Sequence, residues 1–143
     1  MIRFWALLLL SVFAVTAFAE QSKMQGEFTV HYNVFNSASL SAEVARVYGI
    51  TRGGNQGVMT ISVRKKMGSS DAAAKAKVSG GVQNLIGQKE KLAFKEINEA
   101  QAIYYIATFR FDDKDHMKFN VDVTPDGGDL INIALTHQLY VEK

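Results

Sequence analysis

The feature that most constrains this chain is a two-residue periodicity of apolar side chains, which is strongest in residues 103–111. One face of that segment carries Ile103, Tyr105, Ala107, Phe109 and Phe111. After an acidic turn at residues 112–115, the next segment alternates in the same way, with Met117, Phe119, Val121 and Val123 on one face. Successive side chains of a β-strand point to opposite faces, so this pattern predicts strands that bury one face.

The same periodicity predicts strands along most of the remaining chain. These further strands are expected at residues 25–35, 58–66, 75–84, 92–97 and 130–142. The strand at 92–97 changes phase part-way, as at a bulge, and the residues around Gly68 and Pro125 are typical of loops and turns. About seven strands predict an all-β fold, an antiparallel β-sandwich of immunoglobulin-like kind. A closed β-barrel is the alternative fold.

A single short helix is predicted at residues 42–48. Ser41 is a favourable N-cap, Glu43 lies in the first turn where the helix dipole favours an anion, and Gly49 follows as a C-terminal stop. The apolar stripe of this helix is expected to consist of Leu40, Val44, Val47 and Tyr48. We therefore expect about two helical turns lying across a sheet edge or an open end.

The first 19 residues have the pattern of a secretory signal peptide. Arg3 precedes an almost unbroken apolar run from Phe4 to Val15, and Ala17-Phe18-Ala19 is a small-x-small cleavage site. The run is too short for a membrane-spanning helix of roughly 20 residues. We therefore expect residues 1–19 to be removed and residues 20–143, beginning with Glu20, to form a single β-sandwich domain in the periplasm.

Charge and cysteine content restrict the partners of the mature chain. Without Arg3 it keeps 15 of the 16 basic residues against 14 acidic residues, a net charge of +1. Nucleic acids and anionic membranes select clustered Lys and Arg, so neither is the expected main partner after signal cleavage. The chain has no cysteine, so disulfides are excluded. No cofactor is predicted.

Motifs for catalysis and for metal binding are missing from the sequence. There is no Gly-x-Ser-x-Gly elbow, no cysteine nucleophile and no phosphate-binding glycine loop, and we do not expect an enzyme. His31 and His116 point outward from separate predicted strands, and a metal-binding periplasmic protein that uses both is the alternative function. No fixed metal-ligand spacing supports it, while His137 falls on a core face, so no metal ligand is assigned.

Three apolar residues are predicted on outward strand faces: Phe35, Tyr104 and Ile106. Neighbouring strands would gather them into an exposed recognition patch. Alternatively, the helix at 42–48 covers them as part of the fold, and we favour this second interpretation.

Polar residues that a sandwich core does not need are concentrated between residues 31 and 52. The candidate binding residues there are His31, Asn33, Arg46, Tyr48 and Arg52. Tyr and Arg often contribute much of the contact energy in protein interfaces. We therefore expect a non-catalytic binding or assembly module whose partner is another periplasmic protein. A structural domain that dimerises through an edge strand is a further hypothesis.

Several sequence blocks resemble a known family. They are His31-Tyr32-Asn33-Val34-Phe35-Asn36, Leu40, Glu43-Val44-Ala45-Arg46, Tyr48-Gly49-Ile50 with Arg52, Asn84-Leu85-Ile86-Gly87-Gln88, Phe94-Lys95-Glu96-Ile97, Ala102-Ile103-Tyr104-Tyr105-Ile106 and Gln138-Leu139-Tyr140. With these blocks the chain resembles the bacterial domain-of-unknown-function family 4426 over essentially all of its mature length. The resemblance implies an exported Gram-negative protein with an immunoglobulin-like sandwich. It implies no activity, and it assigns no catalytic or binding residue.

Overall fold

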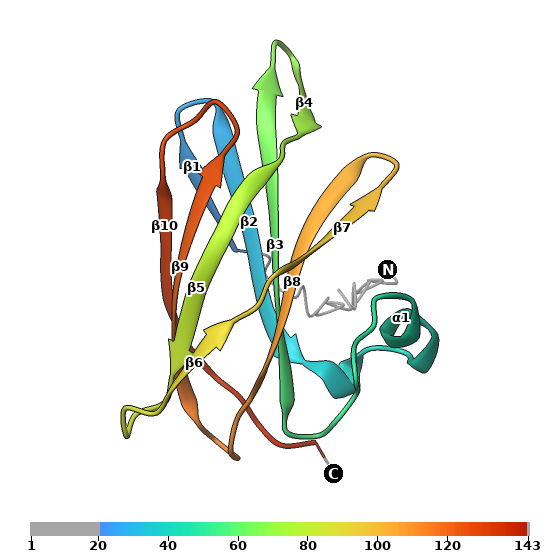
Figure 1. The fold of residues 1–143 in the computed structure, drawn as a ribbon, viewed down its shortest axis with the longest axis vertical. Coiled ribbons are helices and arrows are strands. Elements are labelled where there is room, and N and C mark those ends of the chain that lie inside the picture. Colours follow the sequence, from blue (N-terminus) through green and yellow to red (C-terminus); the bar gives the residue numbers. More distant parts are fainter. Residues whose placement is uncertain (1–20, 143) are drawn as a thin grey trace, which may run out of the picture.

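The computed structural model describes residues 21–142, which form two antiparallel β-sheets packed face to face (Figure 1). Sheet A has the order β1-β2-β3-β8-β7, and β4 also pairs with β3. Its strands are β1 (Gln21–Gln25), β2 (Phe28–Asn36), β3 (Gln56–Met67), β4 (Ser70–Ala73), β7 (Lys95–Glu99) and β8 (Ala102–Arg110). Sheet B has the order β10-β9-β5-β6, with β5 (Ala76–Gln83), β6 (Lys89–Leu92), β9 (His116–Pro125) and β10 (Ile131–Gln138).

The predicted all-β antiparallel sandwich is thus confirmed, and its core lies where the alternating residues indicate. Phe109 of β8 and Phe119 of β9 bring the two sheets together, with ring centroids 5.0 Å apart in an edge-to-face arrangement. Such aromatic pairs favour this geometry because the ring edge is positive and the ring face negative. The predicted signal peptide, residues 1–19, lies outside the described residues and stays a prediction. None of the helices within residues 21–142 is long and apolar enough to cross a membrane.

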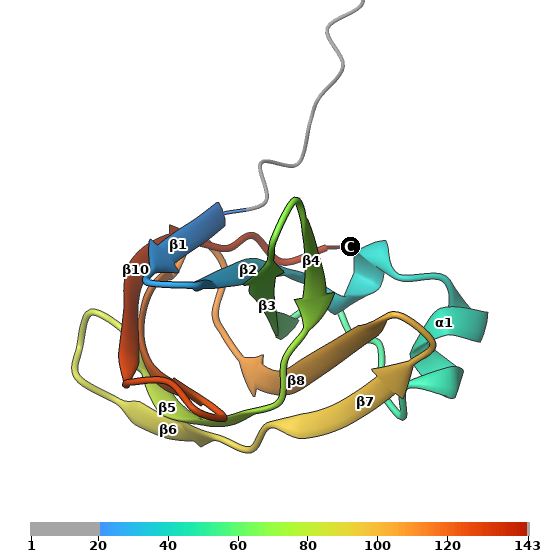
Figure 2. The same cartoon turned by 90° about the horizontal axis from the view of Figure 1, so that it is seen from above.

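Two predictions about the strands were wrong. The expected bulged strand over 92–97 is two strands, β6 in sheet B and β7 in sheet A. The phase slip is the crossing between the sheets, visible between β6 and β7 in Figure 2. Ser70 and Asp71, expected in a loop, belong to β4 because residues 70–73 return along the end of β3 in a hairpin.

One edge strand is attached to the rest of the sandwich mainly by hydrogen bonds. All five residues of β1 are exposed, and its backbone pairs only with β2. Lys23 donates to the carbonyl oxygen of Asn132 at 2.7 Å, and Gln25 donates to that of Leu130 at 3.3 Å. These side chains reach from sheet A to the β10 side of sheet B and so link the two sheets along this margin.

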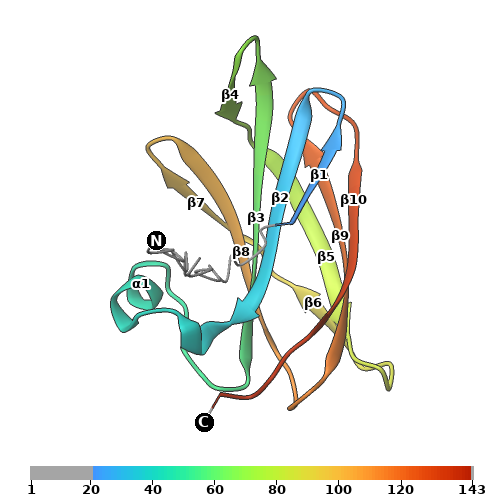
Figure 3. The ribbon, with the colours of Figure 1, turned by 180° about the vertical axis from the view of Figure 1, so that it is seen from behind.

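A short helical layer covers the outer face of sheet A at one end. It consists of the 3₁₀ turn η1 (Ser37–Ser39) and the helix α1 (Ala42–Val47), seen from behind the first view in Figure 3. The predicted helix and its cap are confirmed, since the Ser41 hydroxyl accepts from the backbone N–H of Val44 at 3.2 Å. The predicted apolar stripe was wrong in part. Ala45 is the buried residue, whereas Val47 is 69% exposed.

Tyr105 joins the two sheets through its hydroxyl group. The side chain is buried in the core, and the oxygen accepts a hydrogen bond from the Ala76 backbone N–H at 2.8 Å. It also donates to the carboxylate of Glu96 at 3.0 Å. Burial raises the pKa of Tyr105 above its ordinary value of 10.0, the bond from Ala76 opposes this, and the bond to Glu96 raises the pKa further.

The raised pKa of Tyr105 predicts a loss of stability in alkali. Above about pH 10 the unfolded chain releases the tyrosine proton before the folded chain does, so the free energy of unfolding falls as the pH rises through the folded pKa. The contribution is fully present below that pH. In urea denaturation, Tyr105→Phe should cost about 1–2 kcal/mol near neutral pH, because it leaves the Ala76 N–H unpaired. The variant should also lose less stability than the wild type between about pH 9 and about pH 11. An equal alkaline loss in Tyr105→Phe and in the control Tyr140→Phe, at an exposed site, would contradict the assignment.

Candidate functional site

The position of α1 is set by two polar residues at the end of β2. The Asn36 amide donates to the carbonyl oxygens of Gly54 at 2.8 Å and of Tyr140 at 2.9 Å, while its oxygen accepts from the Ala38 N–H. The hydroxyl of Ser37, a fully buried residue, donates to the Gly53 carbonyl and accepts from the Gly53 N–H, both at 3.0 Å. Three separate segments therefore meet at this junction, and the helical layer leaves sheet A in one fixed direction.

The helical layer rests on a second small core outside the sandwich. Ala45, Ile50, Val58 and Ile106 are its buried members, and Phe35, Leu40, Tyr48, Ile97 and Tyr104 pack against them. Phe35, Tyr104 and Ile106 are the outward apolar residues noted in the sequence. The layer covers them, so the interpretation that we favoured is correct and this exposed patch does not form.

Tyr48, one of the predicted binding residues, makes a contact within the fold. It caps the end of α1 and donates a short hydrogen bond to the Glu99 carboxylate at the end of β7. That hydrogen bond raises the pKa of Tyr48, and burial adds to the effect. The contact ties the helical layer to the edge of sheet A.

The other predicted binding residues do not converge on one cleft. Arg46 is exposed on the last turn of α1, and the Arg52 guanidinium lies 3.5 Å from the Ala38 carbonyl oxygen. His31 and Asn33 are half-buried on β2, on the outward face of sheet A opposite Ser62 and Thr60 of β3. None of the five candidates lines any of the three cavities described below.

The histidines are likewise separated. His31 belongs to sheet A, whereas His116 is exposed at the start of β9 in sheet B. His137 is half-buried on β10, and burial lowers its pKa. Within the described part of the chain, no three His, Asp or Glu residues are grouped as a metal ion would require. The alternative function, a metal site shared by His31 and His116, therefore has no support in this geometry.

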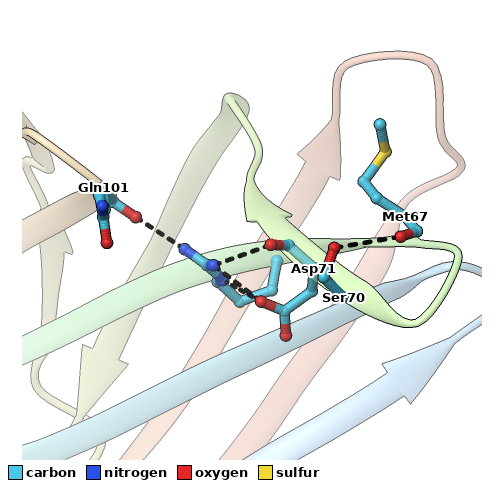
Figure 4. Close-up of polar contacts among 5 residues, drawn as sticks. Met67, Ser70, Asp71 and Gln101 are labelled. Carbon is cyan, nitrogen blue, oxygen red and sulfur yellow. Dashed lines mark hydrogen bonds and ion pairs between the residues drawn. The ribbon is translucent and has the colours of Figure 1, made fainter.

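A cavity of about 540 Å³ lies between the β1–β2 turn and the β3–β4 hairpin, with Met24, Arg64 and Asp71 in its lining. Figure 4 shows the guanidinium group between the labelled residues Asp71 and Gln101, and its hydrogen bonds identify it as that of Arg64. It donates to the Asp71 carboxylate at 2.7 Å and to the Gln101 carbonyl oxygen at 2.8 Å. Its hydrogen-bonding capacity is largely used to fix the hairpin against the β7–β8 turn, so we assign it a structural role.

The opposite end of the sandwich has a second cavity, of about 410 Å³, beside the β5–β6 hairpin. Val82, Phe111 and Met117, all buried, contribute its apolar lining. The polar lining consists of Asn55, Asn84, Gln88, Lys89, Glu90, Arg110, Asp112 and Asp115. Glu90 faces this side of the sheet, because its carboxylate accepts from the Arg110 backbone N–H at 3.3 Å.

A third cavity, of about 600 Å³, lies over the same hairpin and β9. The register pairs Gly81 with Lys91 and Asn120, and Gln83 with Lys89 and Lys118, so these residues share the outer face of sheet B. Gly81 has no side chain, which leaves a hollow bordered by three exposed lysines. We call Gly81 with Lys89, Lys91 and Lys118 the lysine hollow.

The turn between β5 and β6 projects from this end of the sandwich (Figure 1). At its apex Leu85 is 66% exposed and Ile86 is 80% exposed, and we call these two residues the aliphatic tip. Its conformation is fixed by four hydrogen bonds, of which three join Asn84 to Gln88 and the fourth joins the Gly87 N–H to the Asn84 carbonyl. Gly87 adopts a φ of +84°, which favours glycine.

Comparison with known proteins places the chain in a family. The family profile described as Domain of unknown function (DUF4426) matches residues 22–142. The chain belongs to the DUF4426 family. It is similar to the crystal structure of a DUF4426 family protein from Pseudomonas aeruginosa PAO1, with 29% sequence identity and a TM-score of 0.75 over 87% of this chain and 97% of that one. No curated protein matches this DUF4426 member.

The junction at Ser37 predicts a specific loss of stability. Ser37→Ala removes both hydrogen bonds between the Ser37 hydroxyl and the backbone of Gly53. The Gly53 N–H and carbonyl then lose these partners at a partly buried site, which should lower the free energy of unfolding by about 1–3 kcal/mol. Ser39→Ala is the matched control, because that hydroxyl is exposed and donates only to the Asn36 carbonyl oxygen. Urea denaturation of both variants measures the difference. Equal stabilities for the two variants would show that the Ser37 contacts are not critical.

Proposed function

We propose that this DUF4426 protein is exported to the periplasm and acts there as a non-catalytic binding module. Its contact surface is the β5–β6 end of sheet B, and the observation that carries the proposal is the aliphatic tip. Leu85 and Ile86 are adjacent, highly exposed and held on a hydrogen-bonded hairpin. Export is supported by the apolar run and cleavage pattern of residues 1–19.

The aliphatic tip has an energetic reason to meet a partner. Fully burying a Leu or Ile side chain stabilises a complex by roughly 1.5–3 kcal/mol relative to leaving it in water. The fixed hairpin favours binding further, because residues that are already ordered lose little conformational entropy when a complex forms. An exposed pair of aliphatic side chains on a rigid turn is therefore suited to a contact.

A competing surface is the one predicted from the sequence, on the outward side of α1. Arg46 and Val47 are both exposed there. Val47 is 69% exposed, so exposure alone does not separate the two surfaces. The aliphatic tip differs because it adjoins two of the cavities: Asn84 and Gln88 line the smaller one, and Lys89 lines both. These cavities offer room for polar groups of a partner beside an apolar contact.

Export predicts a defined mature protein. Expression of the full chain in a Gram-negative host should yield a periplasmic product whose intact mass corresponds to a start at Glu20. Replacement of residues 1–19 by a single methionine should keep the protein in the cytoplasm. Cell fractionation and mass spectrometry provide the measurement. A full-length product with an uncleaved N-terminus in the membrane fraction would contradict the proposal.

Photochemical cross-linking in cells tests the contact surface without assuming what the partner is. A photoreactive phenylalanine derivative in place of Ile86 should give adducts, whereas the same residue in place of Lys77, exposed at the other end of β5, should give none. A third variant carries the residue in place of Arg46 and tests the surface predicted from the sequence. Adducts at position 46 alone would move the function to α1, and adducts at no position would reject the binding module.

A further inference from the structure

We infer that the aliphatic tip docks on an anionic lipid surface, with the lysine hollow against the lipid headgroups. The inference rests on the proposed function, because it names the partner of the same surface. It combines two features of the β5–β6 end that are adjacent in the structure, an apolar apex and a group of cations. Neither feature is used by the core, and neither lies in the stretch between residues 31 and 52.

The shape of the tip favours a fluid partner. The turn between β5 and β6 projects from the sandwich (Figure 1). Leu85 and Ile86 form its apex, and Asn84 and Gln88 beside them are polar and bonded to each other. A protein partner would need a concave apolar pocket that matches this apex. A lipid layer needs no such match, because its chains rearrange around a small apolar insertion.

The lysines are placed at the height of the headgroups when the tip is inserted. Lys89 and Lys118 flank Gln83, which is only three residues from Ile86, and the rise along a strand is roughly 3.3 Å per residue. Gln83 therefore lies within roughly 10 Å of Ile86, and the backbones of Lys89 and Lys118 lie beside Gln83 on the two neighbouring strands. Long lysine side chains extend toward a polar surface while their stems lie along apolar groups. Lys91 lies two residues farther up the same face.

The three lysines of the hollow, Lys89, Lys91 and Lys118, are not neutralised by ion pairs with carboxylates of the described chain. The adjacent Glu90 carboxylate accepts from Arg110, on the side of the other sheet. In the nearby β8–β9 turn, Asp113 and Asp115 accept from backbone N–H groups. On the outer face of sheet B the three lysines near the tip stand against Asp122, which lies farther from the tip along β9 and accepts from the Asn132 amide. The part of this face beside the tip therefore favours an anion, although the mature chain carries only +1 overall.

The lysine hollow fits the size and chemistry of a headgroup. Its volume is about 600 Å³, and Gly81 keeps its floor free of a side chain. Asn120 and Gln83 add amide donors to the three ammonium groups on its border. A phosphate diester offers oxygen acceptors to such donors. Binding through two aliphatic side chains and three lysines should be weak and reversible, so it requires millimolar lipid to observe.

A tryptophan at the tip provides a direct probe. The only tryptophan of the chain is Trp5, within the predicted signal peptide, so Ile86→Trp in the mature chain 20–143 reports on position 86 alone. Its fluorescence should shift to the blue on addition of vesicles of phosphatidylcholine and phosphatidylglycerol. It should not shift with phosphatidylcholine alone. Val47→Trp on α1 is the matched control and should be insensitive to both vesicles.

Vesicle sedimentation then separates the two parts of the site. Binding of the mature chain to the anionic vesicles should fall at least tenfold in Leu85→Ser/Ile86→Ser. Each lysine near an anionic surface contributes about fivefold, so Lys89→Gln/Lys91→Gln/Lys118→Gln should lose more than tenfold and much of its salt dependence. Lys66→Gln/Lys75→Gln/Lys77→Gln removes three exposed lysines at the other end of the sandwich and should bind like the wild type.

The outcomes distinguish this inference from the proposed function. No sedimentation of the wild type at millimolar anionic lipid, or equal loss in both lysine variants, would overturn the lipid surface. If cross-links from position 86 then still join the chain to a protein, the binding module stands with a protein partner. If vesicles do not bind and position 86 gives no adduct, both proposals fall. Thermal unfolding of each variant shows whether a lost interaction reflects a lost fold.

Discussion

The structure depends on how the chain leaves sheet A at Asn36 and Ser37. At this point β2 ends, and the Asn36 amide spans the Gly54 and Tyr140 carbonyls while the Ser37 hydroxyl serves both backbone groups of Gly53. A buried polar group is costly when unpaired, so these bonds permit only one path for the chain. Because that path directs η1 and α1 outward, Ala45 packs on the outer face of sheet A rather than into the sandwich.

This arrangement explains why the most unusual stretch of the sequence is not the most exposed. Of its polar residues, Asn36 and Ser37 fix the junction and Tyr48 bonds to Glu99. The apolar residues beneath the layer form a second core, which removes a recognition patch from the surface. Among the apolar side chains that stay exposed in the described residues, Leu85 and Ile86 lie outside this stretch, at a turn next to lysines. The exposed features that suit a contact, the aliphatic tip and the lysines, are thus different residues from the binding candidates that the sequence indicated between residues 31 and 52.

Much of the fold follows from side-chain periodicity, because burial of one strand face is a local rule. The inward residues of β8 and β9 were predicted correctly for this reason, as were the cap and length of α1. The sheet to which a strand belongs depends instead on residues far away in the sequence, so periodicity does not predict it. The phase slip near Phe94 looked the same as a bulge, although it marks the passage from β6 to β7. Leu85 and Ile86 were also missed, since two aliphatic residues in a turn do not reveal whether a second element covers them.

The weakly attached strand β1 has a consequence for the order of folding. Its cross-sheet bonds reach Asn132 and Leu130, which are 109 and 105 residues away in the chain. The amide of Asn36 reaches Tyr140 over 104 residues. Contacts of such sequence separation carry the largest loop-closure entropy, so they form after the β9–β10 hairpin and slow the folding of β-rich domains. The first strand of the described chain is therefore among the last to be secured, and its outer edge, which has no partner strand within residues 21–142, stays available to a second chain.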